Sequence, residues 1–309
     1  MCTGRYGGPV QTMDFKRRPA QPYVAGPSLL LGLNFLGRLG QFFALVTYIC
    51  QCAFAVVKAV ATPFGPHDSK TAINDTSKRP IVYTGKRRLI VCPDFALADL
   101  KEVKIRMGCT VNDVVFACLA GAIQRYLQHR EDPAAKRTPL IRAAMPYSFP
   151  NRPTNPDCLT NSWTFVSLAL PMGPMPIERR LREAQLRCAL VKSTPEAWTT
   201  NKLNVVANAV LGPELQTQTI YDYMSRQTMV FTNVPGPTAP IVMFGSEVRN
   251  IVFGCPNLVS QVSVISYKGT VGLSLVVDPD VVKDAHLIGE FFQAELDELM
   301  QPTGGKKKV

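Results

Sequence analysis

Apolar side chains recur at helical spacing between residues 111 and 127, and this is the clearest pattern in the chain. Thr110 precedes them and Asp113 follows three residues later, which is the spacing of a capping box. In a capping box each side chain bonds to the other residue's backbone amide and satisfies a donor that the helix leaves unpaired. Gly121 and the alanines around it leave room for another element to pack closely. The pattern predicts a core helix that begins at Val111.

Shorter apolar segments between turn residues predict strands. These strands are expected at residues 89–92, 140–148, 163–170, 229–232, 248–253, 260–267 and 271–278. Lys268 and Gly269 are expected to form the turn between the last two. Strands mixed with helices along the chain predict an α/β fold, in which a mixed β-sheet carries helices on its faces.

The other helices are predicted from their ends and from the spacing of apolar positions. Asp94 is expected to cap a helix that ends at Met107, with Gly108 as its terminator. Pro176 opens a helix whose apolar side chains are expected to face the core and whose arginines are expected to face water. The inward set is Leu181, Ala184, Leu186, Ala189 and Leu190, and the outward set is Arg179, Arg180, Arg182 and Arg187. Two helical segments follow, and a closing helix is expected over 281–300.

Residues 39–57 carry no charged side chain and lie between Arg38 and Lys58. Their length is close to what a helix needs to cross the hydrocarbon core of a bilayer. Gln41 and Gln51 are less favourable there, so a helix in the membrane interface or in the protein core is the alternative. The long uncharged composition favours contact with a membrane.

Shifts in composition divide the chain into five parts. Residues 1–38 form a basic lead-in rich in Gly and Pro, 39–62 an apolar helix, 63–88 a polar linker, 89–300 a globular domain and 301–309 a basic tail. Lys306 and Lys307 near the end of the tail resemble a dilysine retrieval signal of the endoplasmic reticulum. A solvated charged tail has the same composition, so this alternative stays open.

Composition narrows the classes of partner. A hydrophobic content of 46% in 309 residues indicates a sizeable core, and 34 basic against 23 acidic side chains give a net charge of +11. This charge favours an anionic partner, either a phospholipid surface or the phosphates of a CoA thioester. Nucleic acid is not expected, because no zinc-finger or RNA-binding signature is present. Nine cysteines without a CxxC pair indicate reduced thiols in the cytosol, and three histidines without metal-ligand spacing predict no metal site.

Several motifs occur in an order that resembles a known family. They are TVNDVV at 110–115 before a long apolar helix, MPYS at 145–148, TNVPGP at 232–237, the strand pair at 262–279 and a final helix. Together they resemble the C-terminal half of the wax ester synthase/diacylglycerol acyltransferase (WS/DGAT) family over about residues 67–299. The resemblance implies half of a chloramphenicol acetyltransferase-like fold, in which two such halves meet around an active-site channel.

The resemblance also implies an activity. The family transfers a fatty acyl group from acyl-CoA, used as a co-substrate without a permanently bound cofactor, to diacylglycerol or a long-chain alcohol. We expect this to occur at the cytosolic face of a membrane, the endoplasmic reticulum or the plasma membrane.

The family's HHxxxDG motif, which belongs to its N-terminal half, is absent here. The catalytic residue is therefore unknown, and the chain is expected to be incomplete without an N-terminal acyltransferase half. His67, His129 and His286 have no recognisable orienting partner. The alternatives are a non-catalytic membrane-associated scaffold that pairs with a full-length acyltransferase, and a soluble acyltransferase that uses another acceptor.

Six residues match family motifs and are candidates for bracing the channel. Asn112 and Asp113 match the family's Asn-Asp pair, and helix capping alone also explains them. In the second motif, Thr232 stands where the family usually has Ser, and Asn233 follows it. Pro235 and Gly236 suit the central positions of a type II turn beside the channel, although a plain loop after a strand has the same residues.

Overall fold

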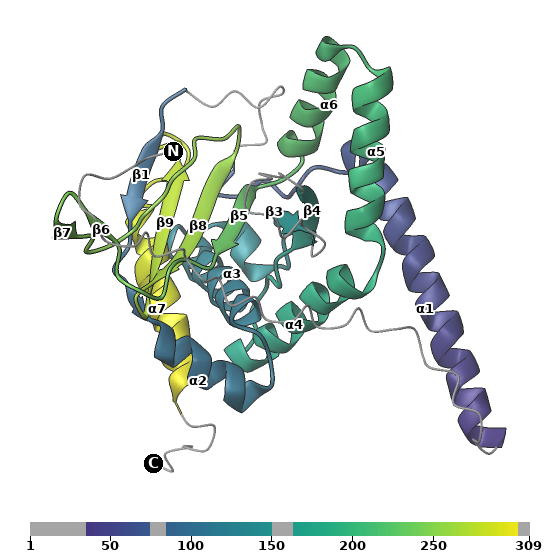
Figure 1. Ribbon diagram of the computed structural model, residues 1–309, viewed down its shortest axis with the longest axis horizontal. Coiled ribbons are helices and arrows are strands. Elements are labelled where there is room, and N and C mark those ends of the chain that lie inside the picture. The colour runs from purple at the N-terminus through teal and green to yellow at the C-terminus, as the bar shows by residue number, and fades with distance from the viewer. Residues whose placement is uncertain (1–34, 75–84, 150–162, 302–309) are drawn as a thin grey trace.

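One mixed β-sheet forms the centre of the computed structural model, which describes residues 35–74, 85–149 and 163–301 (Figure 1). Within these residues the sheet has seven strands in the order β1-β9-β8-β5-β3-β4, and β2 also pairs with β9. The strands are β1 (Arg88–Val91), β2 (Phe95–Ala96), β3 (Arg142–Ser148), β4 (Trp163–Ala169), β5 (Met229–Val234), β8 (Ser260–Tyr267) and β9 (Thr270–Val277). The predictions for residues 1–34, for part of the linker and for the basic tail lie outside the described residues.

The directions of the strands confirm the predicted mixed sheet. β3, β5 and β8 run parallel, whereas β4, β9 and β1 each pair antiparallel with a neighbour. The carboxyl ends of the three parallel strands therefore lie at one edge of the sheet. Lys268 and Gly269 form the predicted turn between β8 and β9, both with positive φ, as a two-residue hairpin favours. A separate small hairpin consists of β6 (Val242–Met243) and β7 (Ser246–Glu247).

Two groups of helices accompany the sheet. The helices are α1 (Phe35–Ala61), α2 (Leu97–Met107), α3 (Val111–His129), α4 (Ile177–Ser193), α5 (Glu196–Val210), α6 (Pro213–Ser225) and α7 (His286–Met300). Helices α2, α4 and α7 pack around α3, whereas α5 packs on β4 and α1 packs on α5. Figure 1 shows α1, α5 and α6 together on one side of the molecule, with β1 and the β6–β7 hairpin on the opposite side.

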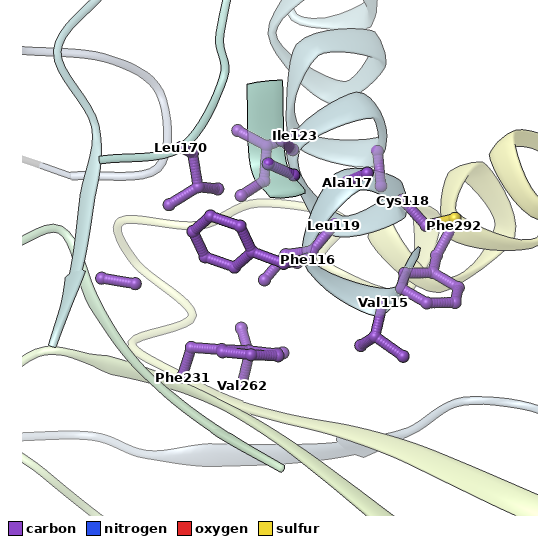
Figure 2. Close-up of a cluster of buried hydrophobic side chains, with 14 of the residues drawn as sticks. Val115, Phe116, Ala117, Cys118, Leu119, Ile123, Leu170, Phe231, Val262 and Phe292 are labelled. Atoms are coloured by element: carbon purple, nitrogen blue, oxygen red, sulfur yellow. The ribbon is translucent and has the colours of Figure 1, made fainter. Parts of the chain in front are cut away.

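Helix α3 is the centre of the core and begins with the predicted capping box. The Asp113 backbone N–H donates to Thr110 Oγ1 at 3.2 Å, and the Thr110 N–H donates to Asp113 Oδ2 at 2.8 Å. The sequence predicts one apolar stripe, yet the helix is buried on all sides from Asp113 to Gln124. Phe116 packs against Phe231 of β5, with ring centroids 5.7 Å apart, as Figure 2 shows. The other side of α3 is covered by α7.

Gly121 permits this close packing of α7 on α3. A Cβ atom at Gly121 would lie 1.9 Å from Oε2 of Glu295, a buried residue of α7. Glu295 accepts a hydrogen bond from Arg125 Nε at 2.5 Å, so the carboxylate next to the glycine is paired. Glycine is therefore required here for space, because the buried Glu295 carboxylate of the ion pair occupies the volume of the missing side chain.

The apolar helix predicted over 39–62 is present as α1. Its last turns are fixed to the domain, because Lys58 Nζ lies 2.8 Å from Glu196 Oε1 and donates to the Ser167 carbonyl at 2.7 Å. Ala55 and Ala59 are buried at the same end. The segment Phe42–Ala61 has a mean hydropathy of 1.9 and only 11% of it is buried, so among the described residues α1 is long and apolar enough to cross a membrane. The proposed domain boundaries at 38, 62 and 88 stay a prediction.

Two predicted helix starts are wrong. Asp94 does not cap α2, because Phe95 and Ala96 first pair with β9 and the helix begins at Leu97 without a side-chain cap. Asp94 instead accepts hydrogen bonds from Asn250 Nδ2. Gly108 does end the helix, in the left-handed conformation that was expected of it. The closing helix begins at His286, five residues later than predicted.

The later start of α7 has a local cause. The Asp278 carbonyl accepts from the N–H groups of Val281 and Val282, which makes a turn after β9. Asp284 then adopts a positive φ of 48°, and α7 starts beyond it.

The strand predicted at 248–253 is also wrong. This segment is irregular and pairs with no strand, because β1 and β5 already occupy both edges of the β8–β9 pair beside it. Its Phe253 carbonyl accepts from Ser274 Oγ at 2.7 Å, so it is tied to β9 through a side chain.

Helix α4 departs from its predicted faces at four positions. Leu186, Ala189 and Leu190 are exposed, Leu186 by 71%, whereas Arg180 is only 3% exposed. The Arg180 guanidinium donates to the carbonyl oxygens of Pro171, Gly173 and Met175, which the preceding loop turns inward. Burial lowers the pKa of Arg180. Arg180 therefore satisfies the backbone of the loop that leads from β4 into α4.

Candidate functional site

The first turn of α3 meets the carboxyl end of β5, at the edge of the sheet where β3 and β8 also end. In sheets with parallel strands, the crevice outside such ends is the usual place for a ligand. At this edge Asn233 Nδ2 of β5 lies 3.4 Å from Asn112 Oδ1 of α3, and both residues are half-buried. The structure therefore joins the two motifs that the sequence singled out, although they are far apart along the chain.

Asp113 follows Asn112 in the first turn of α3 and is only 3% exposed. Its Oδ2 accepts from the Thr110 N–H, and its Oδ1 has no hydrogen-bond partner within the described part of the chain. A carboxylate in the first turn is also favoured by the helix dipole. The cap accounts for the position of Asp113, and the cap in turn fixes the direction in which Asn112 leaves the helix.

Sequence reasoning missed Cys188 at this site. Asn112 Nδ2 lies 3.9 Å from Cys188 Sγ, so the Asn112 amide is held between α4 and β5. Burial, followed by the negative charge of Asp113, raises the pKa of the Cys188 thiol to about 12. Burial and Asp113 raise the pKa of Cys109 as well. These thiols are protonated at neutral pH and are poor nucleophiles. The one sequence signal for Cys188 is its position four residues after Ala184, on the buried face of α4.

Alkylation should separate the buried cysteines from the exposed ones. Burial raises the pKa of Cys92 to about 11 and that of Cys188 to about 12, which leaves roughly 0.1% and 0.01% thiolate at pH 8. We expect iodoacetamide to label the exposed Cys50 and Cys255 at least about a hundredfold faster than Cys92 and Cys188, measured by peptide mass spectrometry. Equal labelling of all four in the native protein would contradict the buried environment, and urea-unfolded protein is the control.

Gly236 follows β5 where the chain passes close to the end of β8. Its N–H donates to Ser266 Oγ at 3.1 Å, and the Pro237 carbonyl accepts from the Lys268 N–H at 3.1 Å. Gly236 does not have a positive φ, so the predicted type II turn is wrong. A Cβ at Gly236 would lie 1.9 Å from the Ser266 carbonyl oxygen. Glycine is needed here for a close approach of two backbones.

The six predicted residues do not all lie together. Asn112, Asp113 and Asn233 are brought together, whereas Thr232 points to the opposite face of the sheet because neighbouring residues of a strand alternate. Pro235 is exposed in the loop that continues from β5.

The histidines lie away from this site. His129 is exposed at the other end of α3, roughly 25 Å from Asn112 along the helix. His67 Nδ1 lies 3.1 Å from Arg226 Nη1, before the amino end of β5 and so at the opposite edge of the sheet. His286 is exposed at the start of α7. The described residues contain no cluster of His, Cys, Asp or Glu with metal-binding geometry, and the general base stays unidentified.

Comparison with known families decides the identity of the domain. The profile of the WS/DGAT C-terminal domain matches residues 159–300. This segment is a WS/DGAT C-terminal domain. The TVNDVV motif at the start of α3 lies before residue 159 and so outside the profile match. The alignment with one curated relative covers 93% of the chain and includes this motif.

Curated relatives of this WS/DGAT domain carry the names of acyltransferases. The chain is 27% identical over 324 residues to wax ester synthase/diacylglycerol acyltransferase 5 of Arabidopsis thaliana, and covers 62% of that protein. It is 26% identical over 262 residues to a putative diacylglycerol O-acyltransferase of Mycobacterium tuberculosis, which matches 80% of this chain and 50% of the relative. The chain thus spans about half to two-thirds of the length of these relatives.

Solved structures confirm the fold. The wax ester synthase/diacylglycerol acyltransferase of Marinobacter aquaeolei VT8 aligns with a TM-score of 0.54 and 19% identity over 81% of this chain and 56% of that one. A nonribosomal peptide synthetase aligns with a TM-score of 0.53 and 13% identity over 82% of this chain and 26% of that one. The WS/DGAT domain therefore has the expected half of a chloramphenicol acetyltransferase-like fold, preceded by an apolar helix.

Proposed function

We propose that this chain is the C-terminal half of an acyl-CoA-dependent O-acyltransferase that forms triacylglycerol or wax ester. Its substrates are acyl-CoA and either diacylglycerol or a long-chain alcohol. The observation that carries the proposal is the contact of Asn112 with Asn233 at the carboxyl edge of the sheet, where both family motifs form one wall. The names of the relatives support the reaction class.

Acyl transfer needs a base to take the proton of the alcohol and donors to stabilise the oxyanion. The wall formed by the two motifs contains two amide side chains that fix each other's orientation. Asn233 donates to Asn112, and Asn112 contacts Cys188. The wall holds no histidine, its thiols are protonated, and its carboxylate, Asp113, caps α3. In this proposal the base comes from an HHxxxDG-bearing N-terminal half, and the role of this chain is to brace the channel.

We also place the protein at the cytosolic face of a membrane, at the endoplasmic reticulum or the plasma membrane. Helix α1 is uncharged along the segment that projects from the domain and is 11% buried there. The cysteines in the described ranges are free thiols, as expected in a reducing compartment. Both substrates of the proposed reaction partition into lipid, so attachment would bring the channel to them.

A reconstitution assay tests the proposed reaction. Purified chain is incubated with labelled acyl-CoA and either diacylglycerol or hexadecanol, with and without a separately purified N-terminal half from a family member. We expect product only when both halves are present, and none when the motif histidines of the added half are replaced by alanine. Within that mixture, Asn233→Ala should lower the rate roughly tenfold because it loosens the wall. Gln128→Ala, exposed near the far end of α3, is the matched control.

Two results would overturn the proposal. Absence of product from the mixed halves would favour the non-catalytic scaffold, provided that the added half is active with its own C-terminal half. Product from this chain alone would require a base within it and would contradict the division of roles.

A further inference from the structure

A strip of apolar side chains leads from the candidate site toward the core. Met145 and Tyr147 of β3, with Phe149 just after the strand, pack against the main core but are only half-buried. We call these three side chains the β3 strip. The rings of Tyr147 and Phe149 meet edge to face, with centroids 5.6 Å apart. Because Ala143 lies opposite Met229 in the parallel pair of β3 and β5, the β3 strip runs beside β5 to the edge of the sheet that holds the candidate site.

The inner end of the β3 strip meets two fully buried rings. Phe116 of α3 and Phe231 of β5 are both 0% exposed, and their ring centroids are 5.7 Å apart (Figure 2). Met145 is level with Phe231 in the parallel strand pair. Phe116 is one helical turn, about 6 Å, beyond Asn112, and Phe231 is two residues before Asn233 on the same face of β5. The ring pair therefore lies beneath the contact of the two asparagines and closes the space between α3 and β5.

A small apolar cavity lies beyond the ring pair. Leu119 and Ile123 line it, and they follow Phe116 on the same face of α3. Met229 lines it from β5, two residues before Phe231 and on the same face of the strand. Apolar cavities in proteins stay dry and accept apolar molecules. The two rings thus separate the β3 strip from a space that suits a hydrocarbon.

We propose that the β3 strip binds the fatty acyl chain of acyl-CoA and that the Phe116–Phe231 pair limits the length of this chain. The inference rests on the proposed acyl-transfer function and names the residues that select its acyl substrate. The thioester end lies at the edge of the sheet that holds Asn233, and the methyl end meets the two rings. Each methylene that leaves water for apolar surface strengthens binding roughly fourfold. A longer chain gains nothing from its last methylenes, because the rings exclude them from the cavity.

Photolabelling locates the methyl end of the bound chain. The full-length protein is irradiated with a palmitoyl-CoA analogue that carries a diazirine at its methyl end, and the labelled peptides are identified by mass spectrometry. We expect label on residues 116–123, 145–149 or 229–231, which surround the ring pair. Excess unmodified palmitoyl-CoA should remove the label, whereas the same excess of CoA should not, because the apolar strip binds the acyl chain.

Shortening either ring is expected to admit longer chains. In Phe116→Leu and in Phe231→Leu, the concentration of stearoyl-CoA that halves the labelling should fall roughly tenfold relative to that of palmitoyl-CoA, because two more methylenes reach the cavity. Phe292→Leu is the matched control. Phe292 is 1% exposed and packs against Phe95 on the other side of α3, with ring centroids 4.8 Å apart. This variant makes the same change in the core but should leave the ratio unchanged, and circular dichroism checks that all three variants are folded.

The outcomes separate this inference from the proposed function. Label outside the three expected segments, or label that excess palmitoyl-CoA does not remove, overturns the inference. A ratio that stays unchanged in both ring variants, or that shifts equally in Phe292→Leu, overturns the role of the ring pair in limiting chain length. None of these measurements needs turnover. Label at the ring pair together with a failed reconstitution assay would therefore contradict the proposed reaction and leave the acyl-binding strip in place.

Discussion

Replacing Asp68 by alanine is expected to lower the free energy of unfolding by about 3–5 kcal/mol. Asp68 is 5% exposed and joins the first part of the predicted linker to the sheet. Its Oδ1 accepts from Arg142 Nε at 2.6 Å, and its Oδ2 accepts from the backbone N–H groups of Arg142 and Thr228 at 2.7 and 2.9 Å. Burial raises the pKa of the Asp68 carboxyl group against the opposing effects of Thr228 and Arg142. Its removal leaves these three donors and the Thr228 hydroxyl, which also donates to Oδ2, without their acceptor.

Urea unfolding followed by circular dichroism measures this loss. The exposed pair of Arg130 and Asp284, whose atoms are 3.4 Å apart, provides the control. Arg130→Ala should cost less than about 1 kcal/mol, because solvent screens an exposed ion pair and Arg130 has an ordinary φ of -80°. Asp68→Asn should also destabilise, since an amide NH₂ would face a donor where the carboxylate accepts. A cost for Asp68→Ala no larger than that of Arg130→Ala would contradict the role given to the buried group.

Replacing Gly236 by alanine is expected to lower the free energy of unfolding by about 1–3 kcal/mol and to lower acyl transfer in the reconstituted enzyme. The new Cβ would overlap the Ser266 carbonyl oxygen, which belongs to the backbone of β8 and cannot rotate away. The loop would have to move outward, which breaks the bond from Gly236 N–H to Ser266 Oγ. Because Asn233 lies only three residues earlier, near the end of β5, that movement also reaches the wall of the candidate site.

Gly40→Ala is the control for this substitution, because a Cβ at Gly40 meets nothing within 4 Å. Thermal unfolding of both variants and their rates in the reconstituted mixture give the comparison. Unchanged stability and rate in Gly236→Ala would show that the end of β8 tolerates a Cβ at this position. The loop at Gly236 would then have no role in holding the candidate site.

Elements with local causes could be predicted from the sequence. The capping box of Thr110 and Asp113, the end of α2 at Gly108 and the turn at Lys268-Gly269 each depend on a few neighbouring residues and were all found. The mixed sheet followed from the alternation of strands and helices. In these cases the backbone conformation is decided within one turn of chain, so spacing alone is enough.

Features that depend on distant groups could not be predicted. Arg180 is buried because three carbonyls of a loop need donors, and nothing in its helix spacing shows that loop. Residues 248–253 have the composition of a strand but find both edges of their neighbours occupied. Whether a segment finds a free strand to pair with depends on the order of strands in the whole sheet. The residues of the segment itself do not determine this.

The candidate site shows the same division. The motifs around Asn112 and Asn233 were singled out from the sequence, whereas their contact depends on the parallel pairing of β3 with β5 and on the packing of α3. Cys188 completes the contact from α4, and no pattern linked it to either motif.

The order of the strands has a consequence for how the protein reaches its native state. Arg88 of β1 lies opposite Val277 of β9, so the outer part of the sheet is completed by residues from the beginning and the end of the domain. Bringing β1 and β9 together closes a loop of nearly the whole domain, and the entropy of loop closure is lost before the strand contacts form. Pairings between residues so far apart in the sequence make folding slow. Until β1 pairs with β9, the unpaired edge of β9 can form hydrogen bonds with other chains and so cause aggregation. Low temperature and low protein concentration during refolding would favour the correct partner.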